Sequence, residues 1–161
     1  MTDAHVEVET LHVAVDIPEH ADRTETPLFE RTRKALIERD KVCWVCGRTA
    51  EESGHPLEAH HDPVERALTE LVDWERFAKD AKAGFYGPNA QMFDWSTFDP
   101  KCPYSFVDDM LHNGLLLCKE HHIAKDAGIH MLPYPLWIAQ RTAKSGYKFS
   151  DAEVIHHVDE I

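Results

Sequence analysis

The sequence lacks a long hydrophobic run, and its N-terminus lacks the pattern of a secretion signal. No stretch approaches the roughly 18 apolar residues that a helix needs to cross a bilayer, so no membrane-spanning segment is expected. The first residues, 1–7, are acidic, and no basic patch precedes an apolar stretch there. We therefore expect a cytoplasmic protein. The sequence also has no internal repeat, so a repeat architecture is not expected.

Positive charge is scarce in this chain. Seventeen Lys and Arg residues face 29 Asp and Glu residues, which gives a formal net charge of −12 at pH 7. This balance is unfavourable for binding nucleic acid, because phosphate contacts need Lys and Arg. The bases are clustered, however: residues 1–25 form an acidic N-terminal segment, whereas residues 30–48 carry six bases against three acids, and residues 133–150 carry three bases and no acid. A local basic surface is therefore compatible with the acidic chain.

Six of these bases are candidate phosphate contacts. They are Arg31, Arg33, Lys34, Lys125, Arg141 and Lys144. The alternative for each one is a place on a solvated helix face.

The chain of 161 residues is long enough for one domain with its own core. Thr26–Pro27 is typical of a helix start, and the apolar spacing carries that helix to about Asp40. The other expected elements are strands around Val6–Ile17, an extended segment at 58–62, helices within 64–82, 119–127 and 135–144, a long ordered loop at 84–105, a strand at 115–117 and a last helix from the capping box at 150–153. This mixture predicts an α+β fold.

Two half-sites with metal-ligand spacing indicate a closed zinc site. Cys43 and Cys46 are separated by two residues, which lets two thiolates from one turn reach the same Zn²⁺. Cys118 and His121 repeat that spacing where a strand meets a helix, so the four ligands predict a treble-clef site with structural Zn²⁺. The alternatives are two disulfides or buried free thiols. Cys102 competes for the fourth position, but it has no partner at useful spacing and is expected to remain an unligated thiol.

Three further histidines are left for a second, open metal site. His60 and His61 are neighbours in an extended segment, so their side chains point to opposite faces and cannot do the same work. On the helix, His121 and His122 point about 100° apart. One histidine of each pair can therefore bind a metal, while the side chain of the other points in a different direction.

The order C-x2-C, HH-x-P and N-x4-C-x2-H-H resembles the HNH endonucleases, which have a ββα-metal core. The resemblance covers residues 43–126 and matches six or more positions in order. It implies that His60 and His122 are ligands of a catalytic divalent metal, that His61 is the general base and that Asn113 orients this base. Many members of the family have Asp where this chain has His60. A neutral imidazole ligand favours softer ions, so Mn²⁺, Ni²⁺ or Zn²⁺ can compete with Mg²⁺.

The resemblance also implies a domain organisation and a partner. Residues 26–161 would form a single nuclease domain that hydrolyses DNA, interrupted by an insert at about 64–112. We expect the insert to be a structural elaboration, with a substrate-shaping lid as the alternative. His130 can approach the metal or a phosphate, or simply pack at the surface. Nothing in the sequence indicates a preferred DNA target or an oligomeric state.

Two other functions compete with the nuclease. One is a non-catalytic, zinc-stabilised module that binds nucleic acid or protein. The other is an acidic partner protein that mimics nucleic acid, suggested by the net charge. The presence of His60, His61, Asn113 and His122 together favours the nuclease, because a degenerate module would usually lose one of them.

Overall fold

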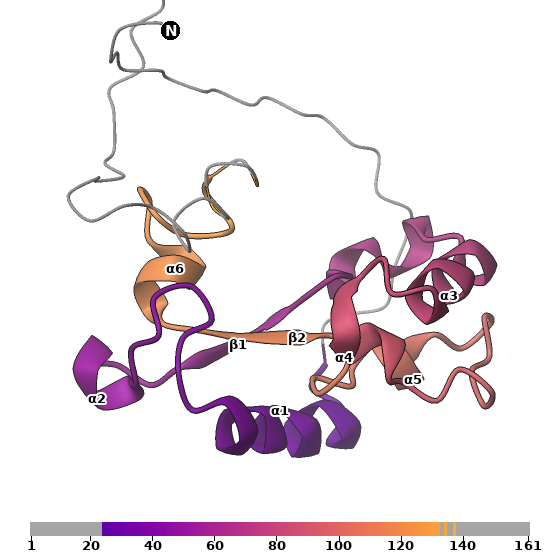
Figure 1. Cartoon of the computed structure of the whole chain (residues 1–161), viewed down its shortest axis with the longest axis horizontal. Coiled ribbons are helices and arrows are strands. Elements are labelled where there is room, and N and C mark those ends of the chain that lie inside the picture. Colours follow the sequence, from indigo (N-terminus) through magenta and orange to yellow (C-terminus); the bar gives the residue numbers. More distant parts are fainter. Residues whose placement is uncertain (1–23, 133, 135–136, 138–161) are drawn as a thin grey trace, which may run out of the picture.

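The computed structural model describes residues 24–132 together with Tyr134 and Trp137, and within them the fold is α+β. A small sheet lies at the centre of the described chain, with helices around it (Figure 1). In chain order the elements are α1 (Pro27–Asp40), α2 (Ala50–Ser53), β1 (Glu58–His61), the 3-10 helix η1 (Arg66–Leu71), α3 (Trp74–Lys82), α4 (Gly87–Gln91), α5 (Tyr104–Val107), β2 (Gly114–Leu117) and α6 (Lys119–Ile123). No helix among the described residues is long and apolar enough to span a bilayer.

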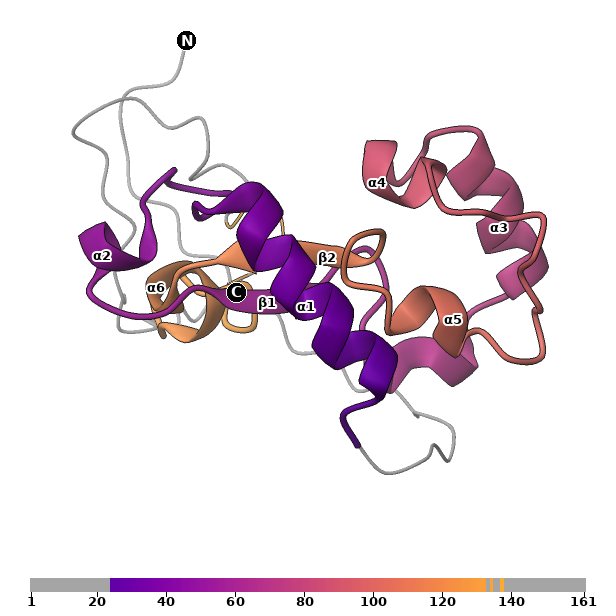
Figure 2. The same cartoon turned by 90° about the horizontal axis from the view of Figure 1, so that it is seen from below.

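The sheet consists of β1 and β2, which pair antiparallel. Glu58 lies opposite Leu117, and His61 lies opposite Gly114 at the other end of the ribbon. Helix α1 covers one face of the ribbon and α6 lies near its other face, while α3, α4 and α5 lie beyond the end at Gly114 (Figures 1 and 2). The two expected extended segments are therefore confirmed, and they are partners of each other.

Helix α1 begins where the sequence predicts. The Thr26 hydroxyl accepts a hydrogen bond from the Phe29 backbone N–H at 3.1 Å, and Pro27 occupies the first helical position, where its missing N–H is not needed. The helix ends at Lys41, which adopts a left-handed backbone with φ of 60°. One face of α1 enters the core through Leu36, which is fully buried with Leu116 and Leu117 of β2.

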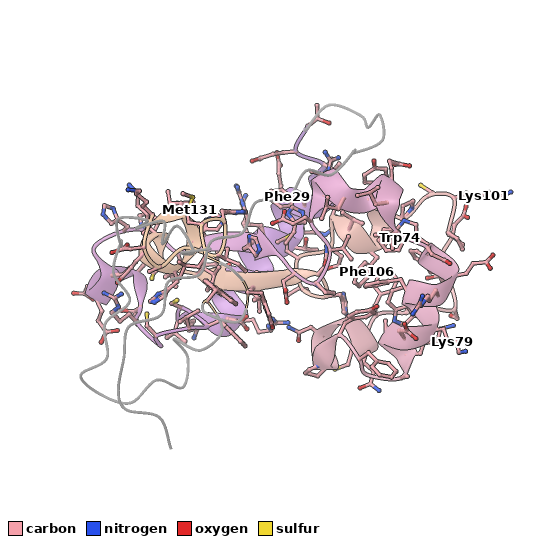
Figure 3. All side chains as sticks on the ribbon, turned by 90° about the horizontal axis from the view of Figure 1, so that it is seen from above. Phe29, Trp74, Lys79, Lys101, Phe106 and Met131 are labelled. Atoms are coloured by element: carbon pink, nitrogen blue, oxygen red, sulfur yellow. The ribbon has the colours of Figure 1, made fainter. Side chains whose placement is uncertain are left out.

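The insert forms a second hydrophobic core of its own. Its centre is aromatic, and Trp74 and Phe106 lie side by side in it (Figure 3). The indole N–H of Trp74 donates to the Thr69 carbonyl at 3.0 Å, and that of Trp95 donates to the Ala90 carbonyl at 2.9 Å. These bonds let two large polar-tipped rings be buried without loss of hydrogen bonding.

The insert is more divided than the sequence suggests. In place of one helix within 64–82, η1 ends and α3 begins anew at Asp73, whose carboxylate accepts from the Arg76 backbone N–H at 3.0 Å. In place of one loop at 84–105, the short helix α4 follows Gly84 and begins at Gly87, both with positive φ, and α5 begins at Tyr104. The cap and the glycines redirect the chain so that its aromatics converge.

Asp108 joins the insert to α1. Its buried carboxylate accepts hydrogen bonds from the Thr26 hydroxyl and from Arg66 Nε, each at 3.0 Å. The hydroxyl of Thr32 adds a bond to the Asp108 carbonyl at 3.1 Å. The start of α1, the start of η1 and the end of α5 are therefore held together around one residue.

Helix α6 is shorter than predicted, ending at Ile123 instead of Ala127. Ala124 adopts an extended backbone, and the chain turns back so that the Ile129 N–H bonds the His121 carbonyl at 3.0 Å. Gly128 allows this turn, because a Cβ atom there would lie 2.6 Å from the Ala124 carbonyl oxygen. The expected strands around Val6–Ile17 and the expected helices from 135 and 150 lie outside the described residues.

We predict that Phe106→Ala lowers the free energy of unfolding by about 3–5 kcal/mol, because it leaves a cavity in the insert core. Phe106 is 0% exposed, whereas Phe85, at 77% exposed, provides the matched control. Phe85→Ala should change the unfolding free energy by no more than about 0.5 kcal/mol. Urea unfolding of the two variants measures the difference. Equal losses would contradict a separately packed insert.

Candidate metal centres

Cys43, Cys46, Cys118 and His121, here called the closed cluster, form a compact group that can hold a metal ion such as zinc. Cys43 and Cys46 come from a tight turn that the Gly47 N–H closes by bonding the Cys43 carbonyl at 2.8 Å. Cys118 is the residue that caps α6, and His121 lies in its first turns. The two half-sites expected from the spacing, Cys43 with Cys46 and Cys118 with His121, therefore lie together in the structure.

The distances within the closed cluster suit a tetrahedral zinc ion. Zinc bonds of about 2.3 Å to sulfur and 2.0–2.1 Å to nitrogen require ligand separations of about 3.8 Å for two sulfurs and about 3.6 Å for sulfur and nitrogen. The Sγ atoms of Cys46 and Cys118 are 3.9 Å apart, and His121 Nδ1 lies 3.8 Å from Cys43 Sγ and 3.2 Å from Cys118 Sγ. Cys102 lies elsewhere as an exposed free thiol.

Arg48 lies against the closed cluster and favours ionisation of one of its thiols. Its Nε donates to Cys46 Sγ at 3.2 Å, and its guanidinium also contacts Glu120. Burial opposes ionisation of Cys46, but the hydrogen bonds from Arg48 outweigh it, so the pKa of this thiol lies below its ordinary value. Burial raises the pKa of Cys118 to about 11. A metal ion would therefore have to displace a proton from Cys118, while Cys46 is already disposed toward the thiolate.

A second group of potential ligands consists of His60, His122 and His130, here called the histidine group. The ring centroids of His60 and His122 are 5.3 Å apart, and the Nε2 atoms of His122 and His130 are 3.2 Å apart. The structure therefore brings together the two ligands expected for the open site. It adds His130, for which the sequence left contact with a metal and surface packing as alternatives.

Two carboxylates surround the histidine group. Glu58 Oε2 lies 2.5 Å from His122 Nδ1, and Glu65 Oε1 lies 3.4 Å from His60 Nε2. Burial, reinforced by the charges of His130 and His122, lowers the pKa of His60 to about 3. His60 is therefore neutral at neutral pH, which is the form that binds a metal. Glu58 was not anticipated, although its place two residues before His60 puts it on the same strand face.

His61 points to the opposite face of β1, as expected. Its ring stacks on Phe29 of α1, with centroids 5.5 Å apart. It lines a pocket of about 280 Å³ whose walls include Glu65, Arg66 and Asp108. Arg66 is a second residue that the sequence did not single out, because an arginine in a helical run carries no distinguishing signal.

Asn113, which is predicted to orient His61, makes its side-chain hydrogen bonds to the main chain. Its amide oxygen accepts from the Val64 N–H at 2.9 Å, and its amide nitrogen donates to the Val64 and Val107 carbonyls, each at 2.9 Å. Asn113 is fully buried and holds the backbone at Val64, where β1 runs into the insert, three residues after His61. A role of Asn113 in orienting His61 stays a prediction.

The structure describes four of the six residues that are expected to contact phosphate. Arg31, Lys34 and Lys125 are exposed, and Arg33 lies over the Phe29 ring with its guanidinium carbon 5.5 Å from the centroid. Arg33 and His61 therefore contact the same ring. Arg141 and Lys144 lie outside the described residues.

Comparisons with known proteins do not extend this description. A scan against protein-family models, a search of curated proteins and a search of solved structures all gave no match. The geometry of the described residues therefore carries the functional argument.

We predict about one tightly bound zinc ion per chain in the purified protein, measured by elemental analysis. Cys118→Ser should lose this zinc and much of the stability, because structural zinc can contribute on the order of 10 kcal/mol to a small site. Cys102→Ser, at the exposed thiol, is the matched control and should keep both. A folded wild-type protein without zinc would refute the assignment.

Proposed function

We propose that this chain is a metal-dependent endonuclease of the HNH type that hydrolyses DNA phosphodiester bonds. The observation that carries the proposal is that His60 and His61, adjacent on β1, lie in two different sites. His60 belongs to the histidine group, whereas His61 lines the pocket. Glu65 lies beside His60 and also lines that pocket. A metal ligand and a proton acceptor on adjacent residues, beside a pocket, are what phosphodiester hydrolysis needs.

The surrounding framework supports the same proposal. The turn with Cys43 and Cys46 is bonded to β2 through the Trp44 N–H and the Leu116 carbonyl at 2.8 Å. Cys118 and His121 begin the helix that follows β2. A ligand-bearing turn combined with a strand-to-helix junction fits a zinc-bound treble clef, and β1, β2 and α6 would be its ββα-metal part.

In the proposed mechanism, His60 and His122 would hold the catalytic metal. When bound, a divalent ion supplies positive charge to the non-bridging phosphate oxygen and to the leaving oxygen. Neutral His61 takes a proton from water while the water oxygen attacks phosphorus in line. The bond from phosphorus to the 3′ oxygen breaks, and that oxygen takes a proton from solvent. Asn113 contributes by fixing the backbone after His61.

The pocket wall offers a phosphate contact in addition to those expected from the sequence. Arg66 projects from η1 and is held by Asp108 at 3.0 Å, with its guanidinium over the Tyr104 ring. A guanidinium presents several N–H donors in a planar fork, a geometry that suits phosphate oxygens. The insert thereby supplies one wall beside the proposed base, in addition to its own packing.

We predict that His61→Ala abolishes plasmid nicking but retains binding of the divalent metal, because the base does not ligate it. His122→Ala should lose both. The loss of activity expected from removing a general base is at least about 10²-fold. Nicking of supercoiled plasmid with Mg²⁺, Mn²⁺, Ni²⁺ or Zn²⁺, combined with metal titration by calorimetry, separates the two roles.

The control for these variants is His55→Ala, since His55 is exposed and lies outside the histidine group. It should cut and bind metal as the wild type does. If His61→Ala loses the metal and His122→Ala keeps it, the two roles are exchanged. If the wild type cuts neither single- nor double-stranded DNA with any of the four ions, the non-catalytic zinc-stabilised binding module becomes the better explanation.

We further predict that reversing Arg31, Arg33 and Lys34 to Glu weakens DNA binding and flattens its salt dependence. Each lost phosphate contact should reduce the slope of log K against log salt by about 0.9. The matched control reverses Lys79, Lys82 and Lys101, which are exposed on the insert, with Lys101 at its outer end (Figure 3). Equal effects of the two triple variants would mean that α1 holds no specific footprint.

A further inference from the structure

The most informative feature beyond the proposed ligand pair is the position of His130. It follows α6 on a tight turn, and its ring centroid lies 4.9 Å from that of His60 and 5.0 Å from that of His122. All three rings therefore surround one point. One ligand nitrogen from each residue lies within 4.8 Å of the other two.

The separation of the two facing nitrogens has the scale of a metal site. Zinc bonds of 2.0–2.1 Å to imidazole in a tetrahedron put two nitrogens about 3.3 Å apart. The Nε2 atoms of His122 and His130 are 3.2 Å apart. Two imidazole nitrogens can meet at this distance by sharing one proton or by sharing one cation. A third nitrogen, from His60, approaches the same point, which a shared proton does not require.

The outer groups also favour a cation. Glu58 Oε2, at 2.5 Å, accepts the Nδ1 proton of His122 and so directs Nε2 of that ring inward. Carboxylates that bond the far nitrogen of a metal-binding histidine fix its tautomer and raise its basicity. Glu65 lies 3.4 Å from His60 Nε2 and 3.9 Å from His130 Nδ1, where it can bond a bound water.

The chain builds the turn that carries His130. The Ile129 N–H bonds the carbonyl of His121, a member of the closed cluster, at 3.0 Å. Gly128 lies so close to the Ala124 backbone that a Cβ atom would not fit. These contacts set the main-chain position of His130, and its partly exposed side chain reaches the histidine group from there.

We infer that His60, His122 and His130 form a three-histidine site with an open fourth position, and that this site takes Zn²⁺, Co²⁺ or Ni²⁺ in preference to Mg²⁺. Neutral imidazoles suit these ions, whereas Mg²⁺ demands oxygen ligands in octahedral geometry and keeps most of its waters. The inference deepens the proposed function and rests on it for its catalytic meaning. The metal site itself is tested without cleavage.

The test uses full-length protein carrying its structural zinc, with Co²⁺ and Mg²⁺ as probes in calorimetry and Co²⁺ in absorption spectroscopy. Wild type should bind one Co²⁺ with a spectrum that lacks thiolate bands, and at least about 100-fold more tightly than Mg²⁺. His130→Ala should weaken Co²⁺ binding at least about tenfold, the scale at which each lost 1.4 kcal/mol appears. His55→Ala, an exposed histidine outside the group, should bind as wild type does.

Two results would overturn the inference. One is His130→Ala binding Co²⁺ with wild-type affinity and spectrum, and the other is wild type binding Mg²⁺ as tightly as Co²⁺. Because Gly128→Ala should displace the turn while leaving all three histidines in the sequence, it must also weaken Co²⁺ binding. Tight Co²⁺ binding through His130 in a protein that cuts no DNA would refute the nuclease and leave the three-histidine site standing.

Discussion

The antiparallel pairing of β1 with β2 is the constraint on which the rest of the described structure depends. With Glu58 opposite Leu117 and His61 opposite Gly114, the strand alternation sends Glu58 and His60 toward α6 and His61 toward α1. A slip of one residue would exchange these faces, placing His61 in the histidine group and His60 on Phe29. The register therefore determines which histidine can be a ligand and which can accept a proton.

So short a ribbon cannot hold this register alone, since an isolated two-stranded sheet is marginally stable in water. The described chain clamps it at both ends. At one end the closed cluster ties the Cys43–Gly47 turn to Cys118, directly after β2. At the other end Asn113 fixes the exit from β1 with three side-chain hydrogen bonds, and Asp108 bonds the insert to α1. Both clamps lie within a few residues of the histidines of the candidate site.

The sequence predicted what is encoded in local spacing. The members of the closed cluster, the opposed directions of His60 and His61, and helix α1 with its Thr26 cap all follow from periods of two to four residues. The fold of the insert did not, because its helices are redirected by Asp73 and two glycines toward an aromatic core made of distant residues. His130 was left undecided for the same reason, since its approach depends on the early end of α6. Asn113 was identified as a site residue, but its side chain bonds the backbone of Val64 and Val107. The sequence alone does not indicate which backbone groups a buried amide will bond.

Charge explains why a site of this kind can use histidine at position 60. In the family that the sequence resembles, an Asp there would bring a negative charge directly to the metal. Here the three proposed ligands would be imidazoles without charge, so a dication bound to them would remain uncompensated in a partly buried place, which is costly. Glu58 and Glu65 lie one step outward, at 2.5 Å from His122 and 3.4 Å from His60, and supply that compensation from behind the ligands. Moving the negative charge outward leaves the ion more able to attract a phosphate, because no anionic ligand competes for it. On an acidic chain with net charge −12, such a site offers the concentrated positive charge that its surface otherwise provides only in small basic clusters.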